Sequence, residues 1–201
     1  MRRICLIAMV TAFVLLSACS GGGNVTSESR PPEPGELTIS FDYERVSGRA
    51  SNQFAVWIED MDGNFVTTLY ATRWTANGGY RNRPDSIHRW VDASGLASMS
   101  QAEVDAISGA TPGTGAVSYA WDLSDRNGNA VAAGQYRFFV EGSLRWRNSV
   151  VYSGVVDIGG GDITVNGEAE FFFVASGNNP ALYEDASENN MITAVTATWK
   201  P

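Results

Sequence analysis

"QFAVWIEDMDGNFVTTLYA", residues Gln53–Ala71, decides the fold class of this chain, because two strand-like segments flank a tight turn. "QFAVWIED" and "NFVTTLYA" are rich in β-branched and aromatic residues, which favour strands. Between them, Asp62-Gly63 is the kind of dipeptide that supplies the positive φ values of a two-residue hairpin turn. The stretch therefore predicts an antiparallel hairpin in an all-β domain.

The same strand signals recur on both sides of this hairpin. Upstream, "ELTISFDYE" (Glu36–Glu44) alternates polar and apolar residues, as a half-buried strand does. Downstream, the strand segments are "AVSYAWDLS" (Ala116–Ser124), "GQYRFFVEG" (Gly134–Gly142), "SVVYSGVVDI" (Ser149–Ile158), "DITVNGEAEFFFVA" (Asp162–Ala175) and "MITAVTATW" (Met191–Trp199). Asn166-Gly167 predicts a second hairpin turn. Many short strands separated by turn signals favour an antiparallel β-sandwich.

The region between Arg73 and Gly115 breaks the strand pattern. Within it, Ser86–Ala93 and Ser100–Ala106 each predict a short helix, and Ser100 before Glu103 fits a capping box. An irregular stretch of about 40 residues is longer than connections between strands usually are. We therefore expect a partly helical insertion in the β domain, at about residues 73–115.

The N-terminus has the three-part layout of a secretory signal peptide. Arg2 and Arg3 precede an apolar run from Ile4 to Leu16, which is too short to span a bilayer as a helix. "LSAC" (Leu16–Cys19) resembles the lipobox of bacterial lipoproteins, in which the cysteine thiol is diacylated before cleavage. The resemblance implies a signal peptide over residues 1–18 and a membrane anchor on Cys19. An ordinary signal peptide with an incidental cysteine is the alternative.

Residues 19–35 have the Gly, Ser and Pro content of a flexible tether and no apolar periodicity. Ser20 stands where an aspartate favours inner-membrane retention in the lipoproteins that this chain resembles, so the expected location is periplasmic, on the outer membrane. The remaining residues, 36–201, number about 165, which suits a single domain with one core.

Composition disfavours several classes of function. Cys5 lies in the leader and Cys19 is the expected anchor, so aromatic packing rather than a disulfide must stabilise the domain. Removal of Arg2 and Arg3 with the leader takes the formal net charge from −8 to −10, which argues against nucleic acid as a partner. His88 is the only histidine of the sequence, so a His/Cys metal site and a Ser-His-Asp triad are both disfavoured.

Two acidic runs, "EDMDGN" and "DLSDRNGN", place oxygen ligands at alternate positions, as calcium sites do. Counted from Asp60 and from Asp125, however, the twelfth residues are Ala71 and Tyr136 and not the bidentate glutamate of an EF-hand loop. We therefore interpret both runs as turns, whose backbone these aspartates hydrogen-bond.

Arginine precedes tryptophan at several positions, which are Arg73-Trp74, Arg89-Trp90 and Arg145-Trp146-Arg147. Such pairs could form an arginine and aromatic site for a phosphate or a flat ring. The favoured interpretation is strand alternation, with tryptophan facing inward and arginine outward.

"AWDLSDRNGNAVAAGQYRFFVEG" (Ala120–Gly142) resembles the immunoglobulin-like module of flagellar hook-capping proteins and of many exported bacterial proteins. The shared positions are Trp121-Asp122, Asp125, Asn127-Gly128, Val131, Gly134 and Tyr136. The resemblance implies an immunoglobulin-like β-sandwich and no flagellar function.

A larger part of the chain is similar to a bacterial family of predicted periplasmic proteins with no assigned activity, domain of unknown function 2271. The pieces that carry this similarity are Phe54–Trp74, "VDAISGATPGTG" (Val104–Gly115) and Trp121–Gly142. The resemblance implies a periplasmic location.

"DAISGAT" (Asp105–Thr111) resembles the flavinylation signature, which is an aspartate, two variable residues, Ser or Thr, Gly, Ala, and Thr or Ser. The resemblance implies that a flavin transferase uses FAD and magnesium to attach FMN to the Thr111 hydroxyl through a phosphoester bond. It also implies that four neighbouring residues serve the cofactor: Asp105, Ser108, Gly109 and Ala110. The chain departs from flavin-carrying domains at Ala106 and in the continuation Pro112–Gly115.

A different interpretation of this loop is purely structural. A helix would end near Ile107, with Gly109 as its C-terminal cap and with Pro112 preventing continuation. Two functions therefore stay open, and neither is enzymatic. One is a covalent FMN carrier that passes electrons between membrane and periplasmic redox partners, with Arg73, Arg81, Arg83 and Arg89 balancing the phosphoester charge. The other is a binding or scaffold module of the cell envelope, whose insertion recognises a partner.

Overall fold

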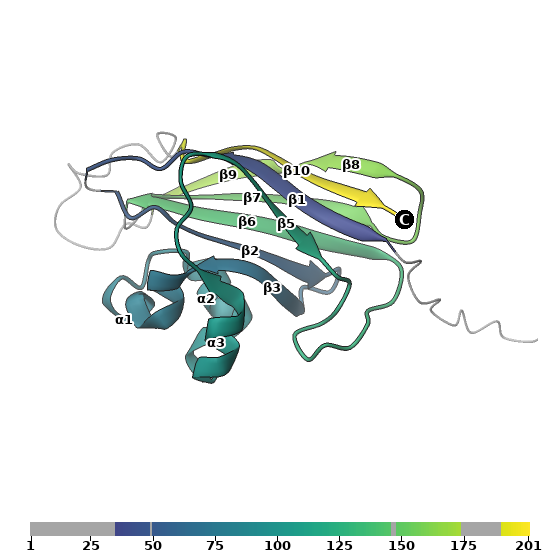
Figure 1. Ribbon diagram of the computed structural model, residues 1–201, viewed down its shortest axis with the longest axis horizontal. Coiled ribbons are helices and arrows are strands. Elements are labelled where there is room, and N and C mark those ends of the chain that lie inside the picture. The colour runs from purple at the N-terminus through teal and green to yellow at the C-terminus, as the bar shows by residue number, and fades with distance from the viewer. Residues whose placement is uncertain (1–34, 49, 146–147, 174–189) are drawn as a thin grey trace, which may run out of the picture.

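The computed structural model describes residues 35–48, 50–145, 148–173 and 190–201. The expected signal peptide, the Cys19 anchor, nearly all of the tether and the Trp146-Arg147 pair lie outside the described residues. Two β-sheets pack face to face, and a layer of short helices covers the outer face of one of them (Figure 1). The prediction of an all-β sandwich with a partly helical insertion is therefore confirmed.

The two sheets have different sizes in the described chain. The four-stranded sheet has the order β5 (Gly115–Trp121), β1 (Glu36–Tyr43), β10 (Ile192–Lys200) and β8 (Ile163–Asn166). The six-stranded sheet has the order β4 (Ser108–Gly109), β3 (Phe65–Thr72), β2 (Gln53–Asp60), β6 (Gln135–Arg145), β7 (Asn148–Asp157) and β9 (Glu168–Phe173). All pairings are antiparallel except that of β3 with β4, which is parallel.

The hairpin between β2 and β3 is confirmed at Asp62-Gly63. Gly63 has a φ of 82°, which a side chain would disfavour. The Asp60 carboxylate accepts hydrogen bonds from the backbone N–H groups of Asp62 (2.9 Å) and Asn64 (2.8 Å). Asp125 holds the backbone of Asn127 (2.8 Å) in the same way, so both acidic runs form turns as expected.

The second predicted hairpin, at Asn166-Gly167, is wrong. β8 pairs with β10 in the four-stranded sheet, whereas β9 pairs with β7 in the six-stranded sheet, so the chain changes sheets at Gly167. A Cβ at Gly167 would lie 3.2 Å from side-chain atoms of Tyr152 and Val195. The glycine therefore permits a close approach at the crossover and does not form a hairpin turn.

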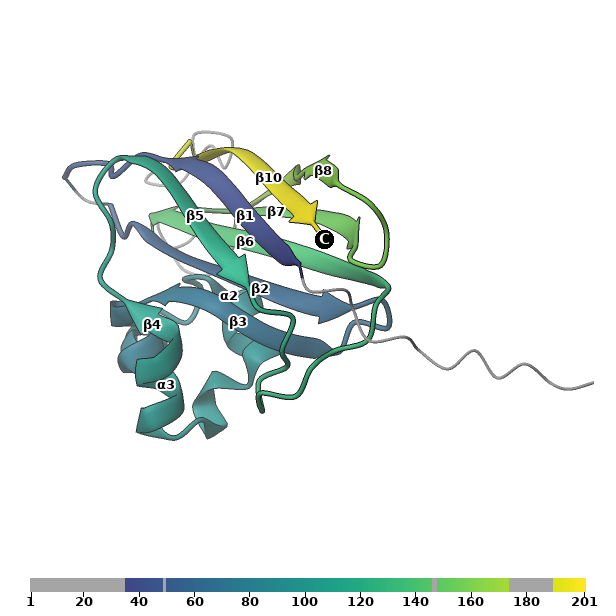
Figure 2. The same cartoon turned by 45° about the vertical axis from the view of Figure 1, so that its right-hand side comes forward.

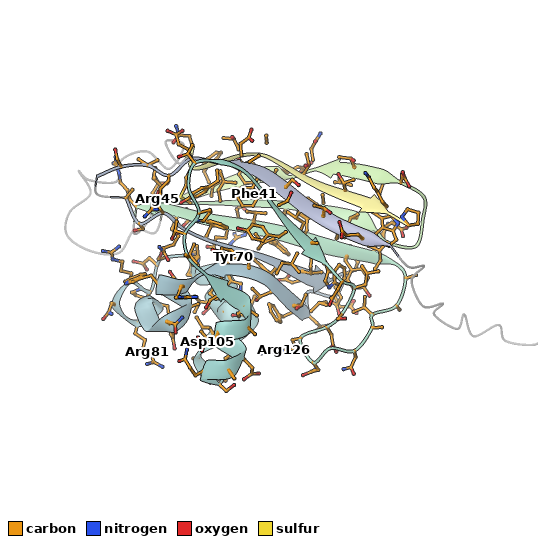
Figure 3. All side chains as sticks on the ribbon, in the orientation of Figure 1. Phe41, Arg45, Tyr70, Arg81, Asp105 and Arg126 are labelled. Carbon is orange, nitrogen blue, oxygen red and sulfur yellow. The ribbon has the colours of Figure 1, made fainter. Side chains whose placement is uncertain are left out.

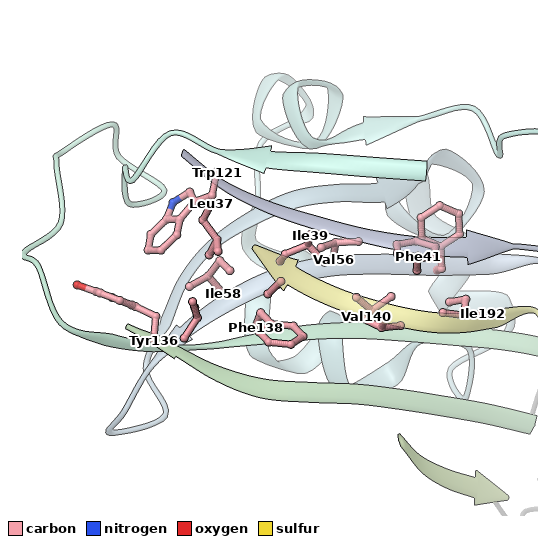
Figure 4. Close-up of a cluster of buried hydrophobic side chains, with 14 of the residues drawn as sticks. Leu37, Ile39, Phe41, Val56, Ile58, Trp121, Tyr136, Phe138, Val140 and Ile192 are labelled. Atoms are coloured by element: carbon pink, nitrogen blue, oxygen red, sulfur yellow. The ribbon is translucent and has the colours of Figure 1, made fainter. Parts of the chain in front are cut away.

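The space between the sheets is filled by large apolar side chains (Figure 4). In β1 every second residue is buried, which matches the alternation of its sequence. Leu37 and Ile39 face Phe138 and Val140 of β6 across the sandwich (Figure 4). Burial of such residues is the main source of stability in a domain without a described disulfide.

The insertion lies against the other face of the six-stranded sheet (Figure 2), and a second core of buried side chains lies between them. There Trp57 stacks on Phe139 with ring centroids 4.8 Å apart, and Ile87 and Trp90 of the insertion are fully buried. β2 is consequently buried at six consecutive residues, from Gln53 to Ile58. The expectation of one core was wrong, because the insertion covers a face that would otherwise be exposed.

The insertion consists of short helical pieces between β3 and β5. They are η1 (Thr75–Gly79), α1 (Tyr80–Asn82), α2 (His88–Ser94), η2 (Leu96–Ser98) and α3 (Gln101–Ile107). The predicted capping box is confirmed, since Ser100 Oγ accepts from the Glu103 N–H (3.3 Å) and Glu103 accepts from the Ser100 N–H (2.7 Å). α2 begins at His88, two residues later than predicted, because Ile87 has a left-handed backbone (φ 43°).

The strand interpretation of the Arg-Trp pairs was wrong for the two pairs that the structure describes. Both pairs lie in helical segments of the insertion. Trp90 is buried in α2 with Arg89 half-exposed, but Trp74 is 42% exposed. In the described parts of the chain, no helix has the length and hydropathy to cross a membrane.

Candidate functional site

The Asp105–Thr111 segment runs from the last turn of α3 into the edge of the six-stranded sheet. α3 ends at Ile107, and Ser108 follows in an extended conformation (φ −114°, ψ 143°). Ser108 and Gly109 pair in parallel with Ala71 and Thr72 of β3. The interpretation of Gly109 as a helix cap is therefore wrong in its detail, because Gly109 belongs to the edge strand β4. We call residues Ser108–Gly115 the acceptor loop.

Tyr70 of β3 determines the path of the acceptor loop. Its hydroxyl donates a hydrogen bond to the Ala110 carbonyl oxygen (2.5 Å). A Cβ added at Gly109 would lie 2.6 Å from the Tyr70 ring, which is closer than two such atoms can approach. Glycine is thus required at position 109, and the backbone is fixed one residue before Thr111.

The Tyr70 ring belongs to a stack of aromatic side chains that joins the two sheets. Tyr70 stacks on Tyr119 of β5 (centroids 4.6 Å apart) and on Phe54 of β2 (5.2 Å). Burial raises the pKa of Tyr70, so its hydroxyl stays a neutral donor at neutral pH. The acceptor loop therefore rests on a packed base, with Tyr70 between Arg45 and Asp105 in the view of Figure 3.

A second contact holds the far end of the acceptor loop. The backbone N–H of Arg45 donates to Thr114 Oγ1 over 3.1 Å. Thr111 is half-buried between the two fixed points, and its hydroxyl has no hydrogen-bond partner among the described residues. The acceptor loop thus presents the Thr111 hydroxyl at the surface, and hydrogen bonds at Ala110 and Thr114 fix the loop on either side of it.

The other residues of the signature have different surroundings. Ser108 Oγ is buried and has no partner in the described structure. Asp105 is exposed and accepts from Gln101 Nε2 (2.9 Å), which also donates to Asn77 Oδ1 (2.8 Å). The structure therefore brings Ser108, Gly109 and Ala110 next to Thr111 along the loop, while Asp105 is held one turn earlier, against the start of the insertion.

Of the four expected arginines, Arg73 is the one that follows directly on the strand paired with the acceptor loop. Arg73 directly follows β3, and its charge lowers the pKa of Tyr70 against the larger effect of burial. The Arg83 guanidinium lies 4.9 Å from the centroid of the Trp74 ring. Arg81 lies over the Tyr80 ring (5.3 Å), and Arg89 pairs with Glu170 of β9 (3.4 Å) at the other side of the sheet. Arg73, one residue after the partner of Gly109, is thus the expected cation next to the acceptor loop.

Sequence reasoning missed Tyr70 and Arg45 as partners of the loop. Tyr70 lies 40 positions before Ala110 and Arg45 lies 69 positions before Thr114, so the pairings depend on tertiary structure. The only available signal was Gly109 itself, because an isolated glycine next to a strand often marks a close backbone approach.

The buried carboxylate of Glu141 holds the insertion on the six-stranded sheet, and sequence reasoning missed this role as well. Glu141 of β6 is fully buried and accepts from the backbone N–H groups of Trp90 (2.9 Å) and Arg89 (3.4 Å) at the start of α2. Burial raises its pKa to about 7, against the lowering effect of these two N–H groups. His88 Nδ1 lies 3.6 Å from Glu141 Oε1, so His88 packs beside the anchor.

The comparisons with known proteins assign the chain to a family. Residues 35–171 match the family described as predicted periplasmic protein, DUF2271. Neither the curated proteins nor the solved structures gave a match. The matched region contains β1 to β8, the whole insertion and the acceptor loop. The chain therefore belongs to the DUF2271 family of predicted periplasmic proteins.

Proposed function

We propose that this protein is a non-catalytic periplasmic carrier of covalent FMN, with the flavin on Thr111. One observation carries the proposal. The Tyr70 ring lies against Gly109 and its hydroxyl bonds the Ala110 carbonyl oxygen, so the backbone is fixed just before Thr111, which offers a hydroxyl on a surface loop. A modifying enzyme needs such a segment, with small residues before the acceptor and a backbone that it can bind in a defined conformation.

The attachment reaction balances without an oxidant. Thr111 Oγ attacks the phosphorus on the flavin side of FAD, and the pyrophosphate P–O bond breaks. AMP leaves, and the hydroxyl proton passes to the transferase, which binds the magnesium. The carrier gains one FMN less one water through a phosphoester bond. This step requires a flavin transferase as partner, and the carrier itself contributes only the acceptor and its placement.

The charges around the loop suit a phosphoester. The whole chain has a formal net charge of −8, yet the exposed Arg73 follows Thr72, which pairs with Gly109 of the acceptor loop, and the exposed Arg45 contacts Thr114 through its backbone. A phosphodiester retains one negative charge, which nearby guanidinium groups stabilise. Ser108 Oγ, at the start of the same loop, is buried and makes no hydrogen bond in the described structure.

Bound FMN would supply the redox chemistry, and the protein would supply position and environment. A lipid on Cys19 would keep the carrier at the outer membrane. The tether of residues 19–35 would let the domain reach about 55 Å from its anchor when fully extended. This range suits exchange of electrons with redox proteins in the periplasm and at the membrane.

In-gel flavin fluorescence tests the proposal. The full chain is exported together with a flavin transferase, beside the variants Thr111→Ala and Ser98→Ala, the second of which removes an exposed hydroxyl elsewhere in the insertion. We expect a fluorescent band for the wild type and for Ser98→Ala, and none for Thr111→Ala. A colourless wild type, with a transferase that labels a known acceptor in the same cells, would leave the envelope binding module as the better account.

A further inference from the structure

We propose that a cavity between α3 and β3 binds a small zwitterionic amino acid through its two charged groups and its apolar side chain. The cavity has a volume of about 150 Å³ and is lined by apolar and charged side chains from separate parts of the chain. We call it the α3 cavity, and the lining residues that carry the argument are Phe65, Met99, Glu103, Ile107, Asp125 and Arg126. The acceptor loop contributes nothing to this lining, and the inference does not depend on a flavin.

The walls of the α3 cavity come from a helix, a strand and a loop. On α3, Glu103 and Ile107 are four positions apart and therefore lie on one face of the helix. Phe65 begins β3, and the loop that carries Arg126 is held beside it, because the Arg126 N–H donates to the Val66 carbonyl oxygen (2.8 Å). Arg126 lies next to α3 in Figure 3. Backbone structure thus sets the shape of the cavity before any ligand binds, which lowers the entropy cost of binding.

Much of the cavity lining is apolar. Phe65, Met99 and Ile107 are each partly buried and pack against the second core. A cavity of about 150 Å³ can hold an apolar group of about the size of benzene, whereas drug-sized ligands need about 300–1,000 Å³. The volume therefore suits the side chain of a single amino acid such as leucine.

The two carboxylates of the α3 cavity are ionised at neutral pH. Hydrogen bonds with Ser100 lower the pKa of Glu103, and hydrogen bonds with Asn129 lower the pKa of Asp125. Glu103 Oε2 accepts from the Ser100 N–H (2.7 Å), while Glu103 Oε1 accepts no hydrogen bond among the described residues. A carboxylate oxygen at the cavity is therefore available to an ammonium group.

The Arg126 guanidinium supplies the positive charge. It lies 5.3 Å from the centroid of the Phe65 ring, and its Nη1 donates to the Ser94 carbonyl oxygen (3.3 Å). Within the part of the chain that the structure describes, it forms no ion pair with Glu103 or Asp125. A guanidinium has five N–H donors, so several remain for a carboxylate. Opposite charges that line one cavity without pairing complement a zwitterion, whose ammonium meets the carboxylates and whose carboxylate meets the arginine.

A chemical-shift titration of the full chain, isotopically labelled at its methionine methyl groups, tests this site. Met99 lines the cavity and reports binding, while Met191 in the core between the sheets reports that each variant is folded. Three probes share one branched alkyl group. L-leucine has both charges, isopentylamine lacks the carboxylate, and isocaproate lacks the ammonium.

We expect L-leucine to shift the Met99 signal and to bind about two- to fivefold more tightly than either probe with a single charge, because each charged contact is partly exposed. Arg126→Gln should weaken leucine binding by a similar factor, and so should Glu103→Gln, whose amide can still cap α3. Ala106→Leu should abolish binding by filling the cavity, which Ala106 lines. Ala102→Leu, on α3 but outside the lining, should bind like the wild type.

Three results would overturn the proposal. A Met99 signal that stays in place at tens of millimolar leucine would remove the site. Isopentylamine or isocaproate that binds as tightly as leucine would show a site for a single charge and not for a zwitterion. Leucine binding that survives in folded Ala106→Leu would place the ligand elsewhere on the molecule.

Discussion

The Tyr70 hydroxyl donates a hydrogen bond to the carbonyl oxygen of Ala110, which is the residue before the proposed acceptor. Tyr70 belongs to β3 and also packs against Tyr119 of β5, so one side chain links the acceptor loop to both sheets. The conformation of the loop therefore depends on the packing of the sandwich, and the proposed function depends on the fold through this contact.

Tyr70→Phe should slow flavin loading while keeping the aromatic stack. The change removes one hydrogen bond and should cost about 0.5–1.5 kcal/mol of stability. Tyr136→Phe is the matched control, because Tyr136 donates to the Ala132 carbonyl oxygen (2.9 Å) in a different loop. Loading rates and urea midpoints of both variants check this. Equal loading rates in the two variants would show that the Tyr70 contact does not position the acceptor.

Gly109→Ala should destabilise the protein by about 1–3 kcal/mol, because the new Cβ would overlap the Tyr70 ring. Gly113→Ala in the same loop is the control, since a Cβ there meets no atom within 4 Å. Urea denaturation measures both. If Gly109→Ala is as stable as Gly113→Ala, the close approach of Tyr70 is not what requires glycine at position 109.

Arg73→Gln should lower the rate of flavin loading about two- to fivefold, the size expected for one exposed charge near the reacting phosphate. The effect should shrink at high salt, because exposed charges are screened. Arg81→Gln removes another exposed cation, which lies over Tyr80, and it should load like the wild type. Equal loading by Arg73→Gln and Arg81→Gln at low salt would remove Arg73 from the account.

Glu141 should make stability fall as pH rises. Its pKa is 4.5 in the unfolded chain and about 7 in the folded chain, because burial disfavours the charged form. Between these values the folded state holds a proton that the unfolded state has lost, so the contribution of Glu141 to stability is greatest below pH 4.5 and decreases until about pH 7. The decrease amounts to about 3 kcal/mol.

Urea denaturation of the wild type and of Glu141→Gln at several pH values measures this contribution. The amide of the variant does not ionise, so the stability difference between the two proteins should change across this pH range. Asp60, Glu103 and Asp125 have lowered pKa values and contribute at more acid pH. A stability difference that stays constant with pH would mean that Glu141 does not titrate in this range.

Local sequence signals predicted the strands, the first hairpin and the capped helix well, because each depends on neighbouring residues. Asp62-Gly63 and the Ser100–Glu103 capping box are such cases. The Asn166-Gly167 turn could not be predicted correctly, since its outcome depends on which sheet each flanking strand joins. The second core was missed for a similar reason: the continuous burial of β2 follows from packing against a distant insertion.

The candidate site likewise combines a motif that local sequence predicts with tertiary contacts that it does not predict. Asp105–Thr111 was found from its residue types alone, but the contacts that give it a conformation come from residues far away in the sequence. Tyr70 and Arg45 carry no local signal of their role. Glu141 lies in an apolar strand, where sequence gives no sign that two backbone N–H groups of α2 would meet it.

The most direct test of the account is the mass of the tryptic peptide that contains Thr111. Cleavage after Arg89 and Arg126 releases one peptide with the whole acceptor loop. From full chain coexpressed with a flavin transferase, the account predicts a gain of one FMN less one water, located on Thr111 by fragmentation and absent in Thr111→Ala. An unmodified peptide from wild-type protein, or a flavin on any other residue, would contradict it.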